Sequence, residues 1–149
     1  MKCLSLTQPW ATLVVEGKKQ FETRSWSTKY RGPLLIHAAK GWPESAKRIC
    51  RFPGLFRDTL VELGYLHDSF NLPRALIIGQ VDLVGVFTTE SQRERIGPEE
   101  EAFGDYGDGR FAWQLENPVI FKQPIPWKGA LGLFEVTDAA TAAVRQGQA

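Results

Sequence analysis

The segment GKKQFETRSW, residues 17–26, decides how the rest of this 149-residue chain is interpreted. It follows a short helical pattern and predicts a turn that runs into a strand. Because a strand sends alternate side chains to opposite faces, Glu22, Arg24 and Trp26 should share one face. A core strand would present an apolar face instead. The segment therefore predicts one wall of a pocket for a planar, polar, anionic ligand.

Length and composition favour one globular domain. With 149 residues, 43% of them apolar, the chain is large enough for its own core. We expect one domain over residues 1–149, with its core at 2–137 and a frayed helix or tail at 138–149. The apolar runs are too short for a membrane span, and the first residues show no signal-peptide pattern. Cys3 and Cys50 are too few for a disulfide framework, which favours a cytoplasmic location.

The net charge of +1 conceals an asymmetry along the chain. Residues 1–57 carry 11 Lys and Arg against 3 Asp and Glu, a net charge of +8. Residues 58–149 carry 7 against 14, a net charge of −7. Two interpretations remain open: a basic face that meets nucleic acid, or two halves that neutralise each other in the fold.

Outside the opening segment, the pattern predicts about six strands with helices inserted between the early ones. We expect strands at 2–6, 21–26, 34–39, 75–87, 110–116 and 132–136, an extended segment at 118–126, and helices at 8–16 and 43–65, the second interrupted at 53–54. Thr7 is the expected N-cap of the first helix. Gly79 and Gly85 predict bulges, which a closing barrel needs. The absence of regular strand–helix alternation favours an α+β fold around a small β-barrel.

Several short motifs together resemble the ASCH domain (activating signal cointegrator homology). They are LTQPWA at 6–11, the G-x-K-x-x-E-x-R core at 17–24, YRG at 30–32, LIHA at 35–38, FAWQL at 111–115 and PIPWKGALGL at 124–133. The resemblance spans about residues 4–136. It implies a PUA-like β-barrel whose cleft is lined by the lysine–glutamate–arginine motif.

The resemblance also implies work on nucleic acids or nucleosides. Relatives are implicated in RNA binding, DNA binding and translation-linked coactivator function, and some cleave single-stranded RNA. A small amidohydrolase branch removes acyl groups from modified cytidine. That branch is similar to this chain at Gly17, Lys19 and Arg24, but it carries a threonine where this chain has Glu22.

Three residues are candidates for catalysis: Lys19, Glu22 and His37. Cleavage of RNA through its 2′-hydroxyl needs a base, an acid and a cation, and these side chains can supply those roles. Each has a structural alternative. Lys19 suits a helix C-terminus, Glu22 can form an ion pair with Arg24, and His37 lies in an apolar strand that favours a core histidine.

The candidates for nucleic-acid contact are cationic and aromatic. Cations bind phosphates and aromatic rings stack on bases, although most tryptophans are core residues and exposed loops are often only solvated. We assign this role to Lys18, Lys19, Arg24, Trp26, Tyr30, Arg31, Trp10 and Trp113. Asp105 and Asp108 match no calcium-loop spacing, so the sequence predicts neither a metal nor a cofactor.

The sequence leaves three functions open. The first is a module that binds single-stranded RNA, or a modified or flipped base, in a basic aromatic cleft. The second is a hydrolase that uses the same cleft, either a ribonuclease or an amidohydrolase on an acylated nucleoside. The third is a protein-interaction domain whose acidic second half meets a basic partner. None of the three involves a membrane.

Overall fold

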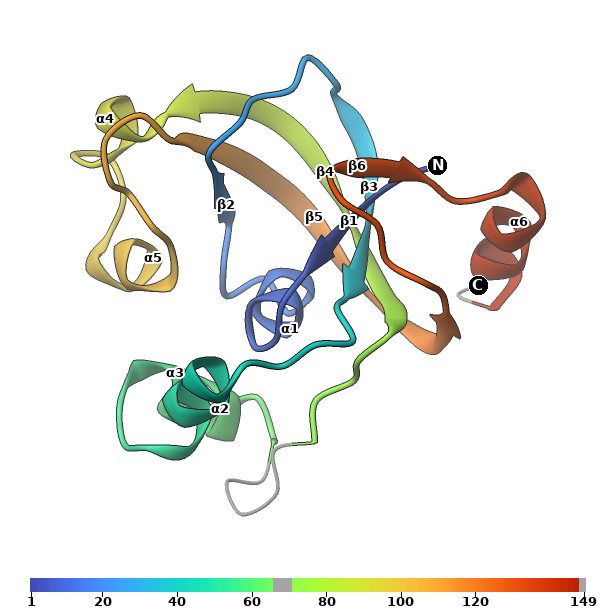
Figure 1. The fold of residues 1–149 in the computed structure, drawn as a ribbon, viewed down its shortest axis with the longest axis horizontal. Helices are drawn as coiled ribbons and strands as arrows, with labels where there is room; N and C mark the ends of the chain where they lie inside the picture. The colour runs from blue at the N-terminus through green and yellow to red at the C-terminus, as the bar shows by residue number, and fades with distance from the viewer. Residues whose placement is uncertain (66–70, 148–149) are drawn as a thin grey trace.

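A single curled sheet organises the computed structural model, which describes residues 1–65 and 71–147. Its strand order is β2-β5-β4-β3-β1-β6. The strands are β1 (Lys2–Leu6), β2 (Phe21–Arg24), β3 (Gly32–Ala38), β4 (Leu76–Thr88), β5 (Phe111–Pro126) and β6 (Leu133–Glu135). The long strands β4 and β5 bend strongly, so the sheet forms a half-barrel (Figure 1). The predicted α+β fold with about six strands is confirmed.

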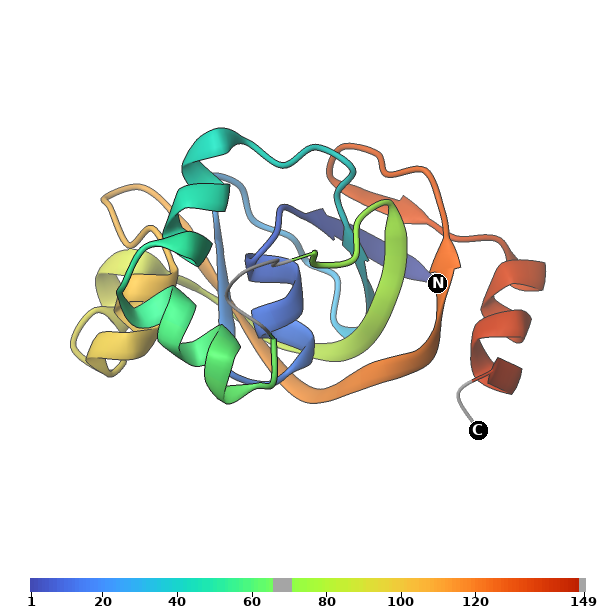
Figure 2. The same cartoon turned by 90° about the horizontal axis from the view of Figure 1, so that it is seen from below.

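Helices lie within this half-barrel and along its outside (Figure 1). They are α1 (Trp10–Val15), α2 (Glu44–Arg51), α3 (Leu55–Glu62), α4 (Thr89–Gln92), α5 (Pro98–Phe103) and α6 (Asp138–Gly147). Helix α1 lies within the curl, whereas α2 and α3 lie outside it beside α1 (Figures 1 and 2). Among the described residues, no helix has the length and apolarity needed to span a membrane.

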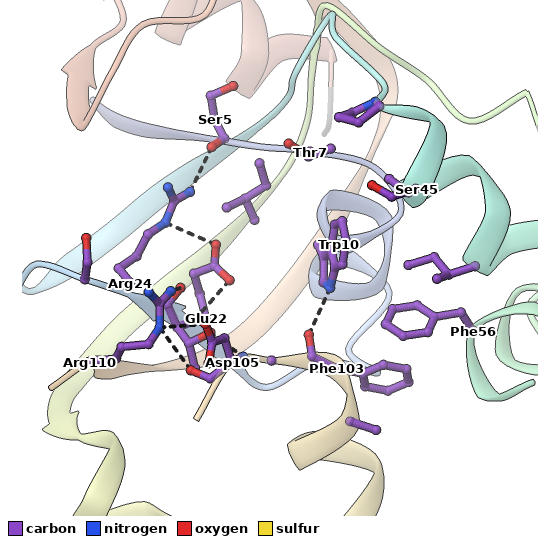
Figure 3. A pocket seen from close by; sticks show the side chains of 18 of the residues that line it. Ser5, Thr7, Trp10, Glu22, Arg24, Ser45, Phe56, Phe103, Asp105 and Arg110 are labelled. Atoms are coloured by element: carbon purple, nitrogen blue, oxygen red, sulfur yellow. Dashed lines mark hydrogen bonds and ion pairs between the residues drawn. The ribbon is translucent and has the colours of Figure 1, made fainter. Parts of the chain in front are cut away.

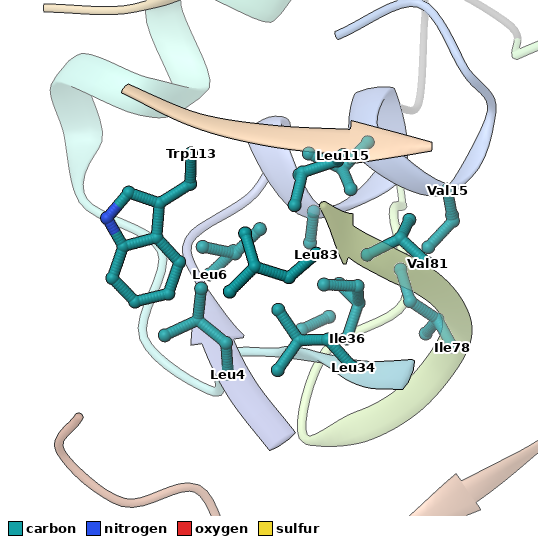
Figure 4. Close-up of a cluster of buried hydrophobic side chains, with 13 residues drawn as sticks. Leu4, Leu6, Val15, Leu34, Ile36, Ile78, Val81, Leu83, Trp113 and Leu115 are labelled. Carbon is teal, nitrogen blue, oxygen red and sulfur yellow. The ribbon is translucent and has the colours of Figure 1, made fainter. Parts of the chain in front are cut away.

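The core fills the concave side of the sheet (Figure 4). It combines α1 with buried side chains of four strands, β1, β3, β4 and β5, and its largest fully buried member is Trp113. The other buried members are Leu4, Leu6, Ala11, Val14, Val15, Leu34, Ile36, Ala38, Ile78, Val81, Leu83 and Leu115. Burying a leucine or isoleucine stabilises the fold by about 1.5–3 kcal/mol. The core therefore fixes β1 and α1, which carry one side of the site described below.

The bulges predicted at two glycines are confirmed. The pairing of β4 with β5 changes register between Ile77 and Gly79, and again between Leu83 and Gly85. At Gly79 the neighbouring strand approaches very closely, because an added Cβ would lie 2.3 Å from the carbonyl oxygen of Val119. These irregularities let the long strands bend around α1.

The start of α1 differs from the prediction. Thr7 is not its N-cap; the helix begins at Trp10, and the side chain of Gln8 accepts a hydrogen bond from the backbone N–H of Thr12 at 3.0 Å. The amide nitrogen of Gln8 donates to the carbonyl of Pro73 at 2.8 Å. This fully buried side chain therefore both satisfies the helix start and ties it to the segment before β4.

The second half of the chain contains a longer strand than the pattern predicts. Residues 110–116 and the proline-bounded segment at 118–126 form one strand, β5. Asn117 has a positive φ of 52°, and the register shifts around it, so the strand absorbs Pro118 in a bulge. Residues 138–147, expected as a frayed helix or tail, form α6, whose Ala140 packs against a second buried cluster.

Candidate functional site

A cavity of about 710 Å³ opens where four parts of the chain meet. Its walls come from the β1–α1 connection, from β2 and the residues after it, from α2 and α3, and from residues 102–110 (Figure 3). This volume is in the range of small-molecule and cofactor sites. The cavity therefore has room for a ligand of nucleotide size.

Strand β2 supplies the polar wall. Glu22, Arg24 and Trp26, which the strand pattern places on one face, all line the cavity. Thr23, from the other face of β2, and Ser25, which follows the strand, also line the cavity.

Glu22 lies between two cations. Its Oε1 is 3.4 Å from the Nζ atom of Lys19, and its Oε2 is 3.2 Å from the Nε atom of Arg24. The backbone N–H of Thr23 also donates to Oε1, at 3.1 Å. Lys19 is only 1% exposed and additionally donates to the carbonyl of Phe21. Lys19 therefore holds Glu22 from behind, while Glu22 and Arg24 face the cavity.

A second carboxylate, partly buried, lies near Lys19. Glu100 accepts a hydrogen bond from the backbone N–H of Gln20. Burial raises the pKa of Glu100, and the nearby charge of Lys19 opposes that rise. Burial, together with the charges of Glu100 and Glu22, also raises the pKa of Tyr106, so its hydroxyl stays protonated at neutral pH. The positive charge of Lys19 therefore offsets the negative charges of both Glu22 and Glu100.

Trp10 supplies the aromatic wall opposite Arg24 (Figure 3). Its indole N–H donates to the carbonyl of Phe103 at 2.9 Å. Its ring packs edge-on against Phe56, with ring centroids 5.8 Å apart. Both contacts hold the indole in one orientation. Trp26 lines the cavity as well, and its ring packs edge-on against Trp113 at 4.8 Å.

Two predicted site residues lie in the interior. Trp113 has no exposed area, and its indole N–H donates to the carbonyl of Trp26 at 3.3 Å. His37 is 1% exposed, and its ring nitrogens lie 2.9 Å from the hydroxyl of Ser5 and 2.7 Å from the carbonyl of Trp127. Burial lowers the pKa of His37, which favours the neutral ring. Neither side chain lines the cavity.

The remaining candidates lie away from the cavity. Lys18 is exposed and pairs with Glu62 at 3.6 Å. The hydroxyl of Tyr30 donates to the carbonyl of Pro33. Arg31 is exposed, and its guanidinium donates to backbone carbonyls of its own loop. The structure thus brings Glu22, Arg24, Trp26 and Trp10 together and leaves these three outside.

Sequence reasoning missed the walls that come from later segments. Arg110 lines the cavity, where its Nε lies 3.4 Å from Asp105 Oδ2 and its Nη2 donates to the carbonyl of Thr23 at 3.3 Å. The helices contribute Ser45, Ile49 and further side chains. No local signal marks these residues, because the pairing of β2 with β5 positions Arg110 and the packing of α2 positions Ser45 and Ile49. Within residues 1–65 and 71–147, no cluster of three His, Cys, Asp or Glu side chains is arranged to hold a metal.

Comparison with known proteins agrees with this architecture. The ASCH domain family matches residues 4–147. The chain belongs to the ASCH domain family. It is 32% identical over 127 residues to activating signal cointegrator 1 of Mus musculus, and 32% identical over 129 residues to that of Homo sapiens. Each match covers 85% of this chain but 21% of the relative, so the chain spans about a fifth of their length.

A solved structure shares the fold. The crystal structure of ASCH from Zymomonas mobilis superposes with a TM-score of 0.61 at 17% identity, covering 97% of this chain and 93% of the other. At this identity the likeness concerns the fold alone. The family is associated with nucleic acids and has a PUA-like fold, as the motifs implied.

Proposed function

We propose that this ASCH domain binds single-stranded RNA, with one unpaired base, ordinary or modified, beside Trp10 and a phosphate at Arg24. The observation that carries the proposal is an indole wall and a guanidinium wall that face each other in one cavity of about 710 Å³. Stacking on an aromatic ring contributes about 1–3 kcal/mol per base and tolerates any base. A guanidinium matches the oxygens of a phosphate.

The fixed orientation of Arg24 supports this role. Its Nε pairs with Glu22, and its Nη2 donates to the backbone oxygen of Ser5 at 3.0 Å. The third nitrogen, Nη1, has no partner among the described residues. Because the side chain is already held, binding a phosphate costs less conformational entropy than it would for a mobile surface arginine.

The recessed position of the walls favours an unpaired base over a duplex. A base can enter such a cavity only after it has left its stack, and that step costs least in a single strand. Sequence-tolerant recognition of RNA usually combines splayed bases on aromatic rings with cations along the backbone. Trp10 and Arg24 are arranged to provide both contacts to one nucleotide.

The experiment is a retention assay with labelled, mixed-sequence single-stranded RNA at low and high salt. Wild type should retain RNA and lose it as salt rises, because phosphate binding releases counterions. Arg24→Ala and Trp10→Ala should each weaken retention about tenfold, in line with the stacking and phosphate energies above. Arg95→Ala, an exposed arginine outside this cavity, is the matched control. Equal retention by wild type and both cavity variants would overturn the proposal.

A hydrolase in the same cavity is the second candidate, because the carboxylate of Glu22 lines the cavity and contacts buried Lys19. His37 is left out of this candidate, because both of its ring nitrogens already have partners. The same samples should be scored for cleavage, alongside acylated cytidine as a free substrate. Product that disappears in Glu22→Gln, compared at equal folded fraction, would favour the hydrolase. Retention without product would favour the binding module.

A further inference from the structure

The turn between α2 and α3 holds a second, smaller hollow beside the main cavity. Its volume is about 230 Å³, and its lining includes Arg48, Phe52 and residues 53–56. Ile49 and Phe56 line both this hollow and the main cavity. The two hollows therefore share part of their lining.

Phe52 gives the hollow an exposed aromatic ring. Its exposed fraction is 61%, although phenylalanine is among the residues most often buried. It directly follows α2, and Pro53 comes next, which restricts the backbone of Phe52 to the extended region that it occupies at φ −84° and ψ 149°. An aromatic ring held on a restrained turn is a surface on which a base can stack.

The charge beside this ring is positive. Helix α2 carries Lys47, Arg48 and Arg51 against one acid, Glu44. Glu44 lies 3.8 Å from Lys47 and 3.9 Å from Arg51, so it partly offsets those two cations. Arg48 is exposed, and its side chain has neither a hydrogen bond nor an ion pair with any described residue. Arg48 is therefore the cation at this hollow that is open to an anionic group.

We infer that the hollow on the α2–α3 turn is a second nucleotide subsite. The base next to the one in the main cavity stacks on Phe52, and its phosphate lies at Arg48. This inference rests on the proposed function and adds the path of the strand. The bound RNA strand runs from the main cavity over the basic helix α2. It does not run over α5, whose Glu99 and Glu101 are exposed and repel phosphate.

The experiment compares ligands of increasing length. Affinities for uridine monophosphate, the dinucleotide UpU and the tetranucleotide of uridine are measured by NMR titration for wild type, Phe52→Ala, Arg48→Ala and Phe52→Trp. Phe87→Ala is the control, because Phe87 is also exposed but does not line either hollow. The loss of one stacked base predicts that Phe52→Ala weakens UpU and the tetranucleotide by about tenfold and leaves the mononucleotide unchanged.

The other two variants test the aromatic ring and the cation separately. Phe52→Trp, which keeps an aromatic ring, should bind UpU about as tightly as wild type. Arg48→Ala should reduce the slope of log affinity against log salt concentration by about 0.7, the contribution of one single-strand phosphate. If Phe52→Ala binds UpU as tightly as wild type, or loses the mononucleotide equally, the second subsite is wrong while the proposed function stands. If wild type binds none of the three ligands, the proposed function fails as well.

Discussion

The Nη2 atom of Arg24 donates a hydrogen bond to the backbone oxygen of Ser5 across 3.0 Å, joining two strands that are not neighbours in the sheet. Strand β2 is an edge strand, and β1 lies four places away in the strand order. The bond therefore crosses the open side of the half-barrel. The same guanidinium lines the cavity, so the residue that closes the fold is also a proposed ligand contact.

This double role predicts a combined effect for Arg24→Lys. A lysine keeps the charge but cannot contact both Glu22 and Ser5 in the same geometry. Losing a hydrogen bond to a charged group should lower the free energy of unfolding by about 1.5–3 kcal/mol. RNA affinity should fall at the same time. Urea unfolding and RNA retention check both effects, and Arg95→Lys should change neither.

The ion pair behind the cavity predicts a larger loss of stability for Glu22→Gln. The change leaves Lys19, 1% exposed, without its carboxylate partner. Breaking a buried pair in this way costs about 3–5 kcal/mol. The double variant Lys19→Met/Glu22→Gln removes both charges and should recover much of that loss in urea unfolding. A double variant no more stable than Glu22→Gln would show that the buried charge is not the cause.

The buried position of Trp113 predicts that it acts on stability rather than on binding. Trp113→Phe removes the hydrogen bond to the carbonyl of Trp26 and leaves a gap in the core. The variant should unfold about 1–3 kcal/mol more easily, because a cavity and a lost hydrogen bond add together. RNA retention, measured at a temperature where the variant stays folded, should match wild type. A selective loss of retention would return Trp113 to the site.

The sequence predicted most of the strands and the early helices because these elements have a local signal. Alternation identified the strands, and Gly79 and Gly85 marked bulges that the register of β4 confirms. The pattern at 17–26 also predicted Glu22, Arg24 and Trp26 in one pocket wall, and all three line the cavity, although β2 ends at Arg24 and both Thr23 and Ser25 line the cavity too. These inferences depend only on residues close in sequence.

The parts that could not be predicted depend on contacts between distant residues. Arg110 reaches the site because β5 pairs with β2, with Arg24 opposite Phe111. No local pattern distinguishes Trp10 from Trp113, yet Trp10 lines the cavity and Trp113 is fully buried. Tertiary packing decides such cases, and a single sequence carries no local signal for it.

The burial of His37 predicts a contribution to acid sensitivity. Burial lowers the pKa of His37 from 6.5, so the unfolded chain takes up a proton at a higher pH than the folded one. The contribution of the neutral ring to the free energy of unfolding is therefore complete above about pH 6.5, and it is lost as the pH falls below that value. Urea unfolding across this range should show a shallower loss for His37→Gln than for wild type. Parallel curves would contradict the prediction, since all other titrating groups are shared.

The close approach at Gly79 predicts that the bend of β4 does not tolerate a side chain. A Cβ there would lie 2.3 Å from the carbonyl oxygen of Val119 and 2.6 Å from a methyl carbon of Val15. Because the first contact is with backbone, β5 or α1 has to move, and overpacking of this kind costs about 1–3 kcal/mol or more. Gly79→Ala should therefore lower the melting temperature. Gly41→Ala, where no atom lies within 4 Å of the added Cβ, should leave the melting temperature nearly unchanged. Equal melting of the two variants would show that the strands can separate at the bulge without cost, and the bend of β4 would then not depend on this glycine.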